Sequence, residues 1–201
     1  MASGQSNYRS AIRSAVRGLW SGVLDEMQFW TAMDTAIRNG LQVAYLAGAK
    51  ECGTLGMDEL SPEMRLELQS LMTNELGQVG GFASAITEGS KANGGKLGPL
   101  FARADLWVMR YTDVVSRGKV AACGDRKLEW VLHLVHFTAD PCRTCAVKLN
   151  GKVKRASYWQ KMGVYPQGPP NPNLECGGWR CGCGFRVTDK PLSRGPLPSL
   201  P

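Results

Sequence analysis

Seven cysteines give the sequence its clearest chemical signal, and five of them are concentrated toward the C-terminal end. A Cys-x-x-Cys pair is followed, after thirty intervening residues, by a Cys-x4-Cys-x-Cys group. Two cysteines separated by two residues can place both sulfurs on one metal ion, and a second group can supply the remaining corners of a tetrahedron. We therefore predict a structural zinc site. Its ligands are four of these five residues: Cys142, Cys145, Cys176, Cys181 and Cys183.

The spacing leaves open which four sulfurs bind. Cys142 and Cys145 form the firmest pair, whereas Cys176 is either an alternate ligand or a spare thiol. Cys181 and Cys183 can both face one ion only if the backbone is not a regular strand, and the neighbouring glycines permit that. The alternatives are reduced or disulfide-capable thiols without a metal, and a redox site. An odd number of cysteines without an apolar export signal argues against a disulfide framework.

No residue pattern in the sequence predicts catalysis, so we expect that the protein is not an enzyme. A redox Cys-x-x-Cys normally lies between a strand and a helix of a βαβ unit, whereas a hairpin is predicted to follow it here. The two histidines, His133 and His136, are interpreted as structural or surface residues. The sequence offers no Ser-His-Asp pattern, no paired carboxylates and no phosphate-binding glycine loop.

The positive charge of the chain is concentrated in the same region as the cysteines. The chain has 201 residues and a formal net charge of +7, with 11 basic and 12 acidic residues over 1–118 but 13 and 5 over 119–201. Aromatic residues interleaved with basic ones are typical of nucleic-acid binding, although a small metal-stabilised module also uses them to fill its core. The predicted contacts to DNA or another polyanion are Lys148, Lys152, Lys154, Arg155, Lys161, Arg180 and Arg186.

Helical periodicity dominates the part of the chain before these residues. Apolar side chains recur at spacings of three and four, which predicts four amphipathic helices. In the first of them Arg9, Arg13 and Arg17 form a basic stripe, a pattern that transit peptides share. No apolar run approaches the ~20 residues of a membrane span, so we expect no membrane association. The predicted helices cover residues 7–20, 23–50, 61–77 and 99–118.

The periodicity changes after residue 125. Alternation over 128–135 predicts a strand, and Asn150-Gly151 predicts a β-hairpin with a type I′ turn over 147–154. The remaining expectations are a short helix at 156–162, an extended proline-rich segment at 166–173 and a loose tail at 189–201.

We therefore predict an α+β protein. An N-terminal helical region precedes a small β-hairpin-containing, zinc-ribbon-like cysteine module. The glycine-rich stretch at 89–98 suggests the boundary between them. The predicted segments are a helical docking region at 1–97, a cysteine module at 98–188 and a proline-rich tail at 189–201.

Residues 139–187 resemble the C-terminal part of tailed-bacteriophage head-morphogenesis proteins, the minor head proteins similar to protein F of phage Mu. That family has a Cys-x-x-Cys pair, a short Leu-x-Gly hairpin, a proline-rich stretch and a closing Cys-x-Cys. An arginine-rich helix before the first cysteines is also usual, and residues 104–121 match it. The chain departs from the pattern at Gly182, where a basic residue is common. The shared residues are Cys142, Cys145, Leu149, Gly151, Cys181 and Cys183.

The resemblance implies a structural virion protein, not a catalyst. Family members are minor capsid proteins that associate with the portal and help head assembly, in some cases accompanying the DNA. It thus implies portal or capsid proteins as partners, non-specific double-stranded DNA as a further contact, and membership of an oligomeric assembly. The location implied is the virion, with the host cytoplasm during assembly. A zinc-ribbon nucleic-acid-binding protein is the alternative.

Overall fold

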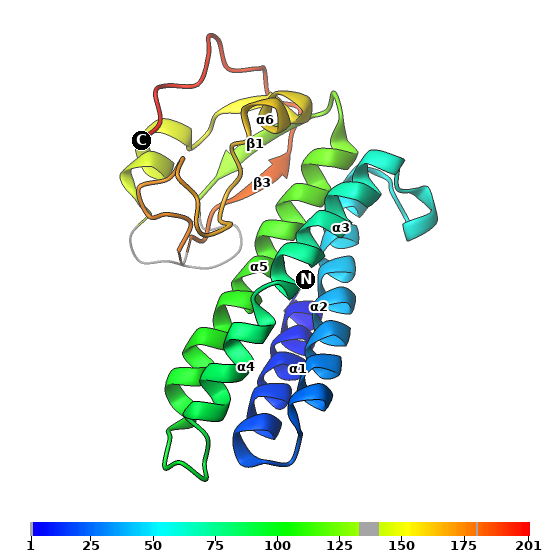
Figure 1. Ribbon diagram of the computed structural model, residues 1–201. Coiled ribbons are helices and arrows are strands. Elements are labelled where there is room, and N and C mark those ends of the chain that lie inside the picture. Colours follow the sequence, from blue (N-terminus) through cyan, green and yellow to red (C-terminus); the bar gives the residue numbers. More distant parts are fainter. Residues whose placement is uncertain (1, 133–140, 180) are drawn as a thin grey trace. The chain divides into compact units, whose positions relative to one another are not determined.

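The computed structural model describes residues 2–132, 141–179 and 181–201 (Figure 1). Within these residues, long helices accompany a three-stranded antiparallel sheet, which confirms the α+β class. The chain forms two compact units. The helical unit comprises Met1–Ala44 and Arg65–Tyr111, and the cysteine unit comprises Tyr45–Met64 and Thr112–Pro201.

Of the five long helices in the described residues, α1, α2, α3 and α5 correspond to the four predicted ones. The start of the third was predicted correctly, because the Ser61 hydroxyl accepts a hydrogen bond from the N–H of Met64 at 3.3 Å and so caps the helix. The fourth helix was not predicted, because it is short and contains Gly80 and Gly81. None of the helices in the described part of the chain is long and apolar enough to cross a membrane. The helices are α1 (Ala2–Ser21), α2 (Glu26–Ala49), α3 (Pro62–Leu76), α4 (Val79–Glu88) and α5 (Leu97–Cys123).

The compact units divide the chain differently from the predicted segments. Helices α2, α3 and α5 each contribute residues to both units. The expected boundary after residue 97 falls at the start of α5, and the glycine-rich stretch before it connects two helices of the helical unit. The cysteine unit therefore includes residues 45–64 as well as residues 112–188 of the predicted module, whereas residues 98–111 of that module belong to the helical unit.

The core of the helical unit is aromatic. Phe29 of α2 and Phe82 of α4 meet edge to face with 6.4 Å between ring centroids, and Phe82 lies 5.1 Å from Trp107 of α5. Arg13, from the predicted basic stripe of α1, pairs with Asp105 of α5 at 2.6 Å. At least this member of the stripe therefore stabilises the helical unit instead of offering a free charge.

Two glycines allow α2 and α5 to approach closely within the cysteine unit. A Cβ on Gly48 would overlap the carbonyl oxygen of Val115, and one on Gly118 would overlap that of Tyr45. The helices therefore contact through their backbones at this crossing. The intrinsic cost of glycine in a helix, about 1 kcal/mol each, is offset by a contact that no larger residue permits.

The sheet of the cysteine unit has the order β2-β1-β3, with both pairs antiparallel. Figure 1 shows β1 and β3 side by side. Three buried aromatic side chains pack together, with ring centroids 5.0 to 5.8 Å apart. They are Trp130 of β1, Trp159 of the short helix α6 and Phe185 of β3. The elements are β1 (Lys127–Val131), β2 (Val153–Arg155), α6 (Ala156–Met162) and β3 (Gly184–Val187).

The predicted hairpin over 147–154 is wrong. Residues Thr144–Leu149 form a π-helical segment, and β2 pairs with β1 instead. Asn150 has φ −52° and ψ 129°, and Gly151 has φ 73°, as in a type II turn and not a type I′ turn. Asn-Gly thus marks a turn correctly, but the turn joins a helical segment to a strand. The predicted strand 128–135 is confirmed as far as Val131, and its end at 133–135 lies outside the described residues.

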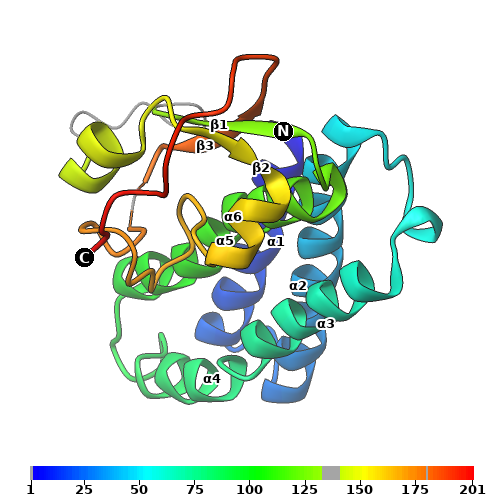
Figure 2. The same ribbon diagram turned by 90° about the horizontal axis from the view of Figure 1, so that it is seen from above.

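The sequence suggested a loose proline-rich tail, but the structure shows a tail that is docked on the cysteine unit. The backbone N–H of Ser193 donates to the carbonyl of Val153 at 3.0 Å, and Leu197 and Leu200 pack against the core of the cysteine unit. Figure 2 shows this segment, in red, passing β2 and α6. The sequence could not predict this docking, because proline removes the periodic pattern by which a packed segment is recognised.

Alanine substitutions test the glycine-mediated crossing. We expect Gly48→Ala or Gly118→Ala to lower the free energy of unfolding by at least about 2 kcal/mol, because the new methyl group meets backbone that cannot move aside. Gly80→Ala in α4 is the matched control. A Cβ there meets nothing within 4 Å, so alanine should stabilise by about 1 kcal/mol. Denaturant unfolding followed by circular dichroism measures all three, and equal effects would contradict the close crossing.

Candidate metal centre

Three buried cysteines form the centre of the cluster. The sulfur atoms of Cys145, Cys181 and Cys183 all lie within 4.8 Å of one another. Their residues are 1%, 8% and 2% exposed, respectively. Four thiolates around a zinc ion, each at about 2.3 Å, lie about 3.8 Å apart, so a small contraction would place these three sulfurs on one ion.

Cys142 and Cys176 lie at the edge of this group. Both are half-buried and have free thiols. The Cys142 thiol hydrogen-bonds with those of Cys145 and Cys176, and Cys181 is close enough to Cys176 for its charge to raise the pKa of Cys176. Three of the five predicted ligands therefore meet within 4.8 Å, and Cys142 and Cys176 are the two candidates for the fourth corner.

A reciprocal pair of hydrogen bonds joins the two cysteine-bearing segments. The backbone N–H of Thr144 donates to the carboxylate of Glu175 at 3.2 Å, and the N–H of Glu175 donates to the hydroxyl of Thr144 at 3.3 Å. Each residue directly precedes a cysteine, Cys145 in one case and Cys176 in the other. This clasp therefore fixes the first cysteine turn against the loop that supplies the second.

Gln167 supports the third cysteine-bearing stretch. Its side-chain amide donates to the carbonyl of Cys183 at 2.9 Å, and it is 3% exposed. Its φ of 67° is unusual for a residue with a side chain. A Cβ on Gly178 would lie 2.7 Å from the carbonyl oxygen of Gln167, so only glycine lets the loop after Cys176 approach this closely. The backbone between Cys181 and Cys183 is not a strand, which is the condition the spacing required.

The charge states of the central thiols differ because they share hydrogen bonds. Hydrogen bonds from the thiols of Cys145 and Cys183 hold the pKa of Cys181 at about 3, despite its burial. The Cys145 thiol donates to Cys181 and Cys183 and is buried, and both effects raise the pKa of Cys145. The hydrogen bond from the Cys145 thiol lowers the pKa of Cys183. The hydrogen bond that Cys183 makes to Cys181 and the burial of Cys183 outweigh this effect and raise the pKa of Cys183 to about 12.

The outer thiols are also influenced by backbone amides. Burial raises the pKa of Cys142, but hydrogen bonds from the amides of Cys145 and Cys176 bring it below its usual range. Burial raises the pKa of Cys176 to about 12, although the amide of Gly178 opposes this. Amides directed at sulfur favour thiolates, which are the form in which cysteine binds a metal.

The residues fit a soft cation such as zinc. The donor set consists of sulfur alone, it is buried, and the hydrogen-bonding thiols provide protons that a cation would replace. The indole N–H of Trp130 is buried without a hydrogen-bond partner, yet it contributes to lowering the pKa of Cys183. An otherwise unpaired N–H near a sulfur is well suited to stabilising a thiolate ligand. The cluster can therefore hold a metal ion.

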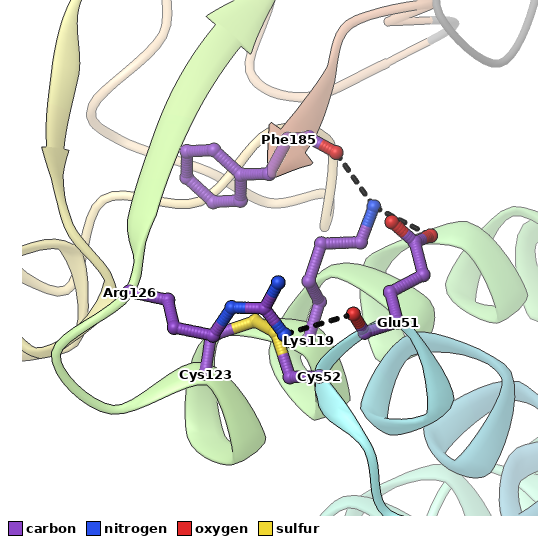
Figure 3. Close-up of a disulfide and its surroundings, with 6 residues drawn as sticks. All are labelled: Glu51, Cys52, Lys119, Cys123, Arg126 and Phe185. Atoms are coloured by element: carbon purple, nitrogen blue, oxygen red, sulfur yellow. Dashed lines mark hydrogen bonds and ion pairs between the residues drawn. A yellow bond between two sulfur atoms is a disulfide. The ribbon is translucent and has the colours of Figure 1, made fainter. Parts of the chain in front are cut away.

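The other two cysteines are paired, although the sequence argued against a disulfide framework. Cys52, at the end of the turn after α2, and Cys123, at the end of α5, form a disulfide with Cα atoms 5.1 Å apart. Figure 3 shows the ammonium of Lys119 nearby, where it donates to the carbonyl of Phe185 at 2.6 Å and pairs with Glu51 at 2.7 Å. Spacing did not reveal this pair, because 71 residues separate its members.

The predicted polyanion contacts have several different environments. Lys154 is buried and Lys148 half-buried, and both donate to carbonyls of the tail. Arg155 is exposed but pairs with Asp125 at 3.7 Å. Lys152 is half-buried, and Lys161 and Arg186 are exposed. Arg180, like His133 and His136, lies outside the described residues.

Sequence reasoning missed the residues that support the cluster. Thr144 and Glu175 lie next to predicted ligands, and this position was the available signal. Gln167 and Trp130 offered no signal, because a glutamine in a proline-rich segment and a tryptophan in an alternating strand have no distinctive pattern.

Comparison of the chain with protein-family models, curated proteins and solved structures found no match. The function is therefore inferred from the residues themselves.

Counting thiols tests the division between one disulfide and a reduced cluster. In denaturant without reductant, we expect an alkylating reagent to modify the five free cysteines, and after reduction all seven. Chelator is present in both samples to remove any bound metal. Mass spectrometry of the intact chain gives the count, and peptide mapping locates the unmodified pair. Seven modified cysteines before reduction would contradict the disulfide.

Proposed function

We propose that this chain is a structural protein of a tailed-phage head, with its cysteine unit stabilised by a zinc ion. The observation that carries the proposal is the convergence of three buried cysteines, Cys145, Cys181 and Cys183, with the free thiols of Cys142 and Cys176 at the edge of the group. These cysteines include the ones on which the resemblance to minor head proteins rests. In this role the protein contributes to head assembly beside the portal or capsid proteins, in the virion and, before that, in the host cytoplasm.

A structural role for the metal follows from burial and from the type of ligand. A catalytic zinc usually has three protein ligands, commonly including histidine or carboxylate, and an open position for water. Here the central donors are all sulfur and almost fully buried. The core also includes Trp130 and Trp159, so a metal would be continuous with the aromatic packing. When bound, zinc supplies cross-linking of three chain segments and no redox chemistry.

The alternative function is a zinc-ribbon protein that binds nucleic acid. Lys161 and Arg186 are exposed and would be cations for phosphate contacts, together with Arg155, which is exposed but pairs with Asp125. Against this alternative, the amino groups of Lys148 and Lys154 are directed to carbonyls of the chain's own tail. The basic residues are therefore only partly available as a binding surface, which favours a structural role with DNA as a secondary contact.

Elemental analysis of protein purified without chelator tests the metal. We expect about one zinc per chain, and less than about 0.2 in Cys145→Ser, because that sulfur contacts those of both Cys181 and Cys183. The variant should also lose near-ultraviolet circular dichroism, since the cluster shares its core with two tryptophans. A variant with Cys52→Ser and Cys123→Ser is the matched control and should retain the zinc. Metal-free wild-type protein with five free thiols would exclude the zinc site.

Mass spectrometry of purified particles tests the assembly role. We expect peptides of this chain in both empty proheads and mature virions, at constant stoichiometry relative to the portal protein. Host cytoplasmic proteins provide the background control. Absence from both kinds of particle would exclude the role in heads.

DNA binding by the purified protein tests the alternative. If the affinity falls steeply with salt, and the double variant Arg155→Ala with Lys161→Ala no longer binds DNA, the nucleic-acid-binding alternative is correct.

A further inference from the structure

The C-terminal tail is held by a specific set of contacts on the outer edge of the sheet. Strand β2 is an edge strand, and Val153 lies on it. The N–H of Val153 donates to the Ser193 hydroxyl at 3.0 Å, and the N–H of Ser193 donates to the Val153 carbonyl at 3.0 Å. The tail therefore covers backbone groups that an edge strand otherwise leaves exposed.

Lys154 and Tyr158 form the centre of this docking site. Lys154 is 7% exposed, and its ammonium donates to the carbonyl of Ser193 at 2.8 Å and to that of Gly195. It also lies 5.2 Å from the centroid of the Tyr158 ring. The hydroxyl of Tyr158 accepts a hydrogen bond from the N–H of Leu197 at 3.3 Å. These contacts recognise main-chain N–H and carbonyl groups of the tail on both sides of a bend at 194–196, where Gly195 has a φ of 70°.

The end of the tail is anchored in two further ways. The ammonium of Lys148 donates to the carbonyl of Ser199 at 2.7 Å. Leu197 and Leu200 pack against the core of the cysteine unit. The tail is thus bound through both its carbonyl groups and its leucines, as a peptide ligand is bound.

The composition of the tail suits this mode of binding. Prolines at 191, 196, 198 and 201 favour an extended conformation. A segment whose backbone is already restricted by proline loses less conformational entropy when it binds, and proline-rich peptides dock on aromatic-lined grooves for this reason. Residues 193–200 and the site formed by Lys148, Val153, Lys154 and Tyr158 are therefore complementary as ligand and receptor.

We propose that this site also receives residues 193–200 of a second copy, so that neighbouring chains are linked by exchanged tails. Before the docked segment, Lys190 is held by its ion pair with Glu129 of β1 at 2.6 Å. Pro191 and Leu192 between these points are exposed. They form a short hinge at which the tail can leave its own chain. The exchanged tail makes the same contacts in the second copy, which is the usual basis of domain swapping. The inference requires neither the zinc ion nor the role in phage heads.

A mixing experiment with two full-length variants tests the exchange. Lys154→Met disables the docking site but leaves the tail intact. Ser193→Pro with Leu197→Asp disables the tail, because it removes the Ser193 N–H and hydroxyl and places a charge in the core. Neither variant can form an exchanged pair alone. Mixed in equal amounts, the intact tail of one should bind the intact site of the other.

Sedimentation velocity and native mass spectrometry give the result. We expect each variant alone to be monomeric and the mixture to contain a 1:1 heterodimer. Lys96→Met is the control for Lys154→Met, because Lys96 is exposed in the helical unit and this variant keeps both tail and docking site. It should gain no heterodimer with the tail variant. A mixture that stays monomeric at every concentration at which the protein is soluble would overturn the proposal.

A direct binding measurement covers the case in which a variant is misfolded, as judged by circular dichroism. Tyr158→Phe, which removes only the acceptor for the Leu197 N–H, then replaces Lys154→Met. A fluorescent peptide of residues 188–201 should bind the tail variant and be displaced by unlabelled peptide. Adding Tyr158→Phe to the tail variant should weaken that binding several-fold, as loss of one hydrogen-bond acceptor predicts, and Lys154→Met, where it folds, should weaken it about tenfold or more. Absence of peptide binding to a folded tail variant would also overturn the proposal.

Discussion

The cysteine unit depends on keeping several sulfur atoms close together in its interior. Buried thiolates at such short separations repel one another, so they cannot all be charged unless a cation lies among them. Without a metal, shared protons resolve this conflict, with Cys181 as the thiolate and Cys145 and Cys183 as donors. A divalent ion resolves it better, because it attracts every sulfur at once. The surrounding loops therefore hold the sulfurs close enough together for one ion to contact several of them.

The parts of the unit around the cluster hold the sulfurs in this way by using contacts that need little hydrophobic area. The Thr144–Glu175 clasp and the Gln167 side chain fix the cysteine-bearing segments through hydrogen bonds to the backbone. The aromatic group of Trp130, Trp159 and Phe185 fills the space beneath the sheet strands and shares one core with the sulfurs. The disulfide is formed by two cysteines that are not part of the sulfur cluster, although Cys123 belongs to the same buried core. The seven cysteines thus divide between two tasks, one covalent and one based on free thiols.

The sequence predicted features that are governed by local periodicity. Helices α1, α2, α3 and α5 were found because their apolar residues repeat along one face. Three of the five cysteines grouped by their spacing, Cys145, Cys181 and Cys183, lie together in the structure, because metal ligands follow characteristic spacings. Features set by tertiary contacts were missed or misread. Residues 147–149 read as a strand but belong to a π-helical segment, and β3 is too short, at four residues, to show a pattern. Cys52 and Cys123 are paired by the approach of two helices, which no local pattern records.

The excess positive charge is a further feature that the sequence predicted in amount but not in environment. In the sequence, lysines 148 and 154 look like a cationic surface beside a metal module. In the structure, their amino groups bind neutral carbonyls of the tail, so their charge is retained but they are directed inward. Lys119 and Lys190 are similarly occupied by Glu51 and Glu129. The basic character of the cysteine unit therefore serves in large part to hold the unit's own segments together, and only the remaining exposed cations are available for an acidic partner.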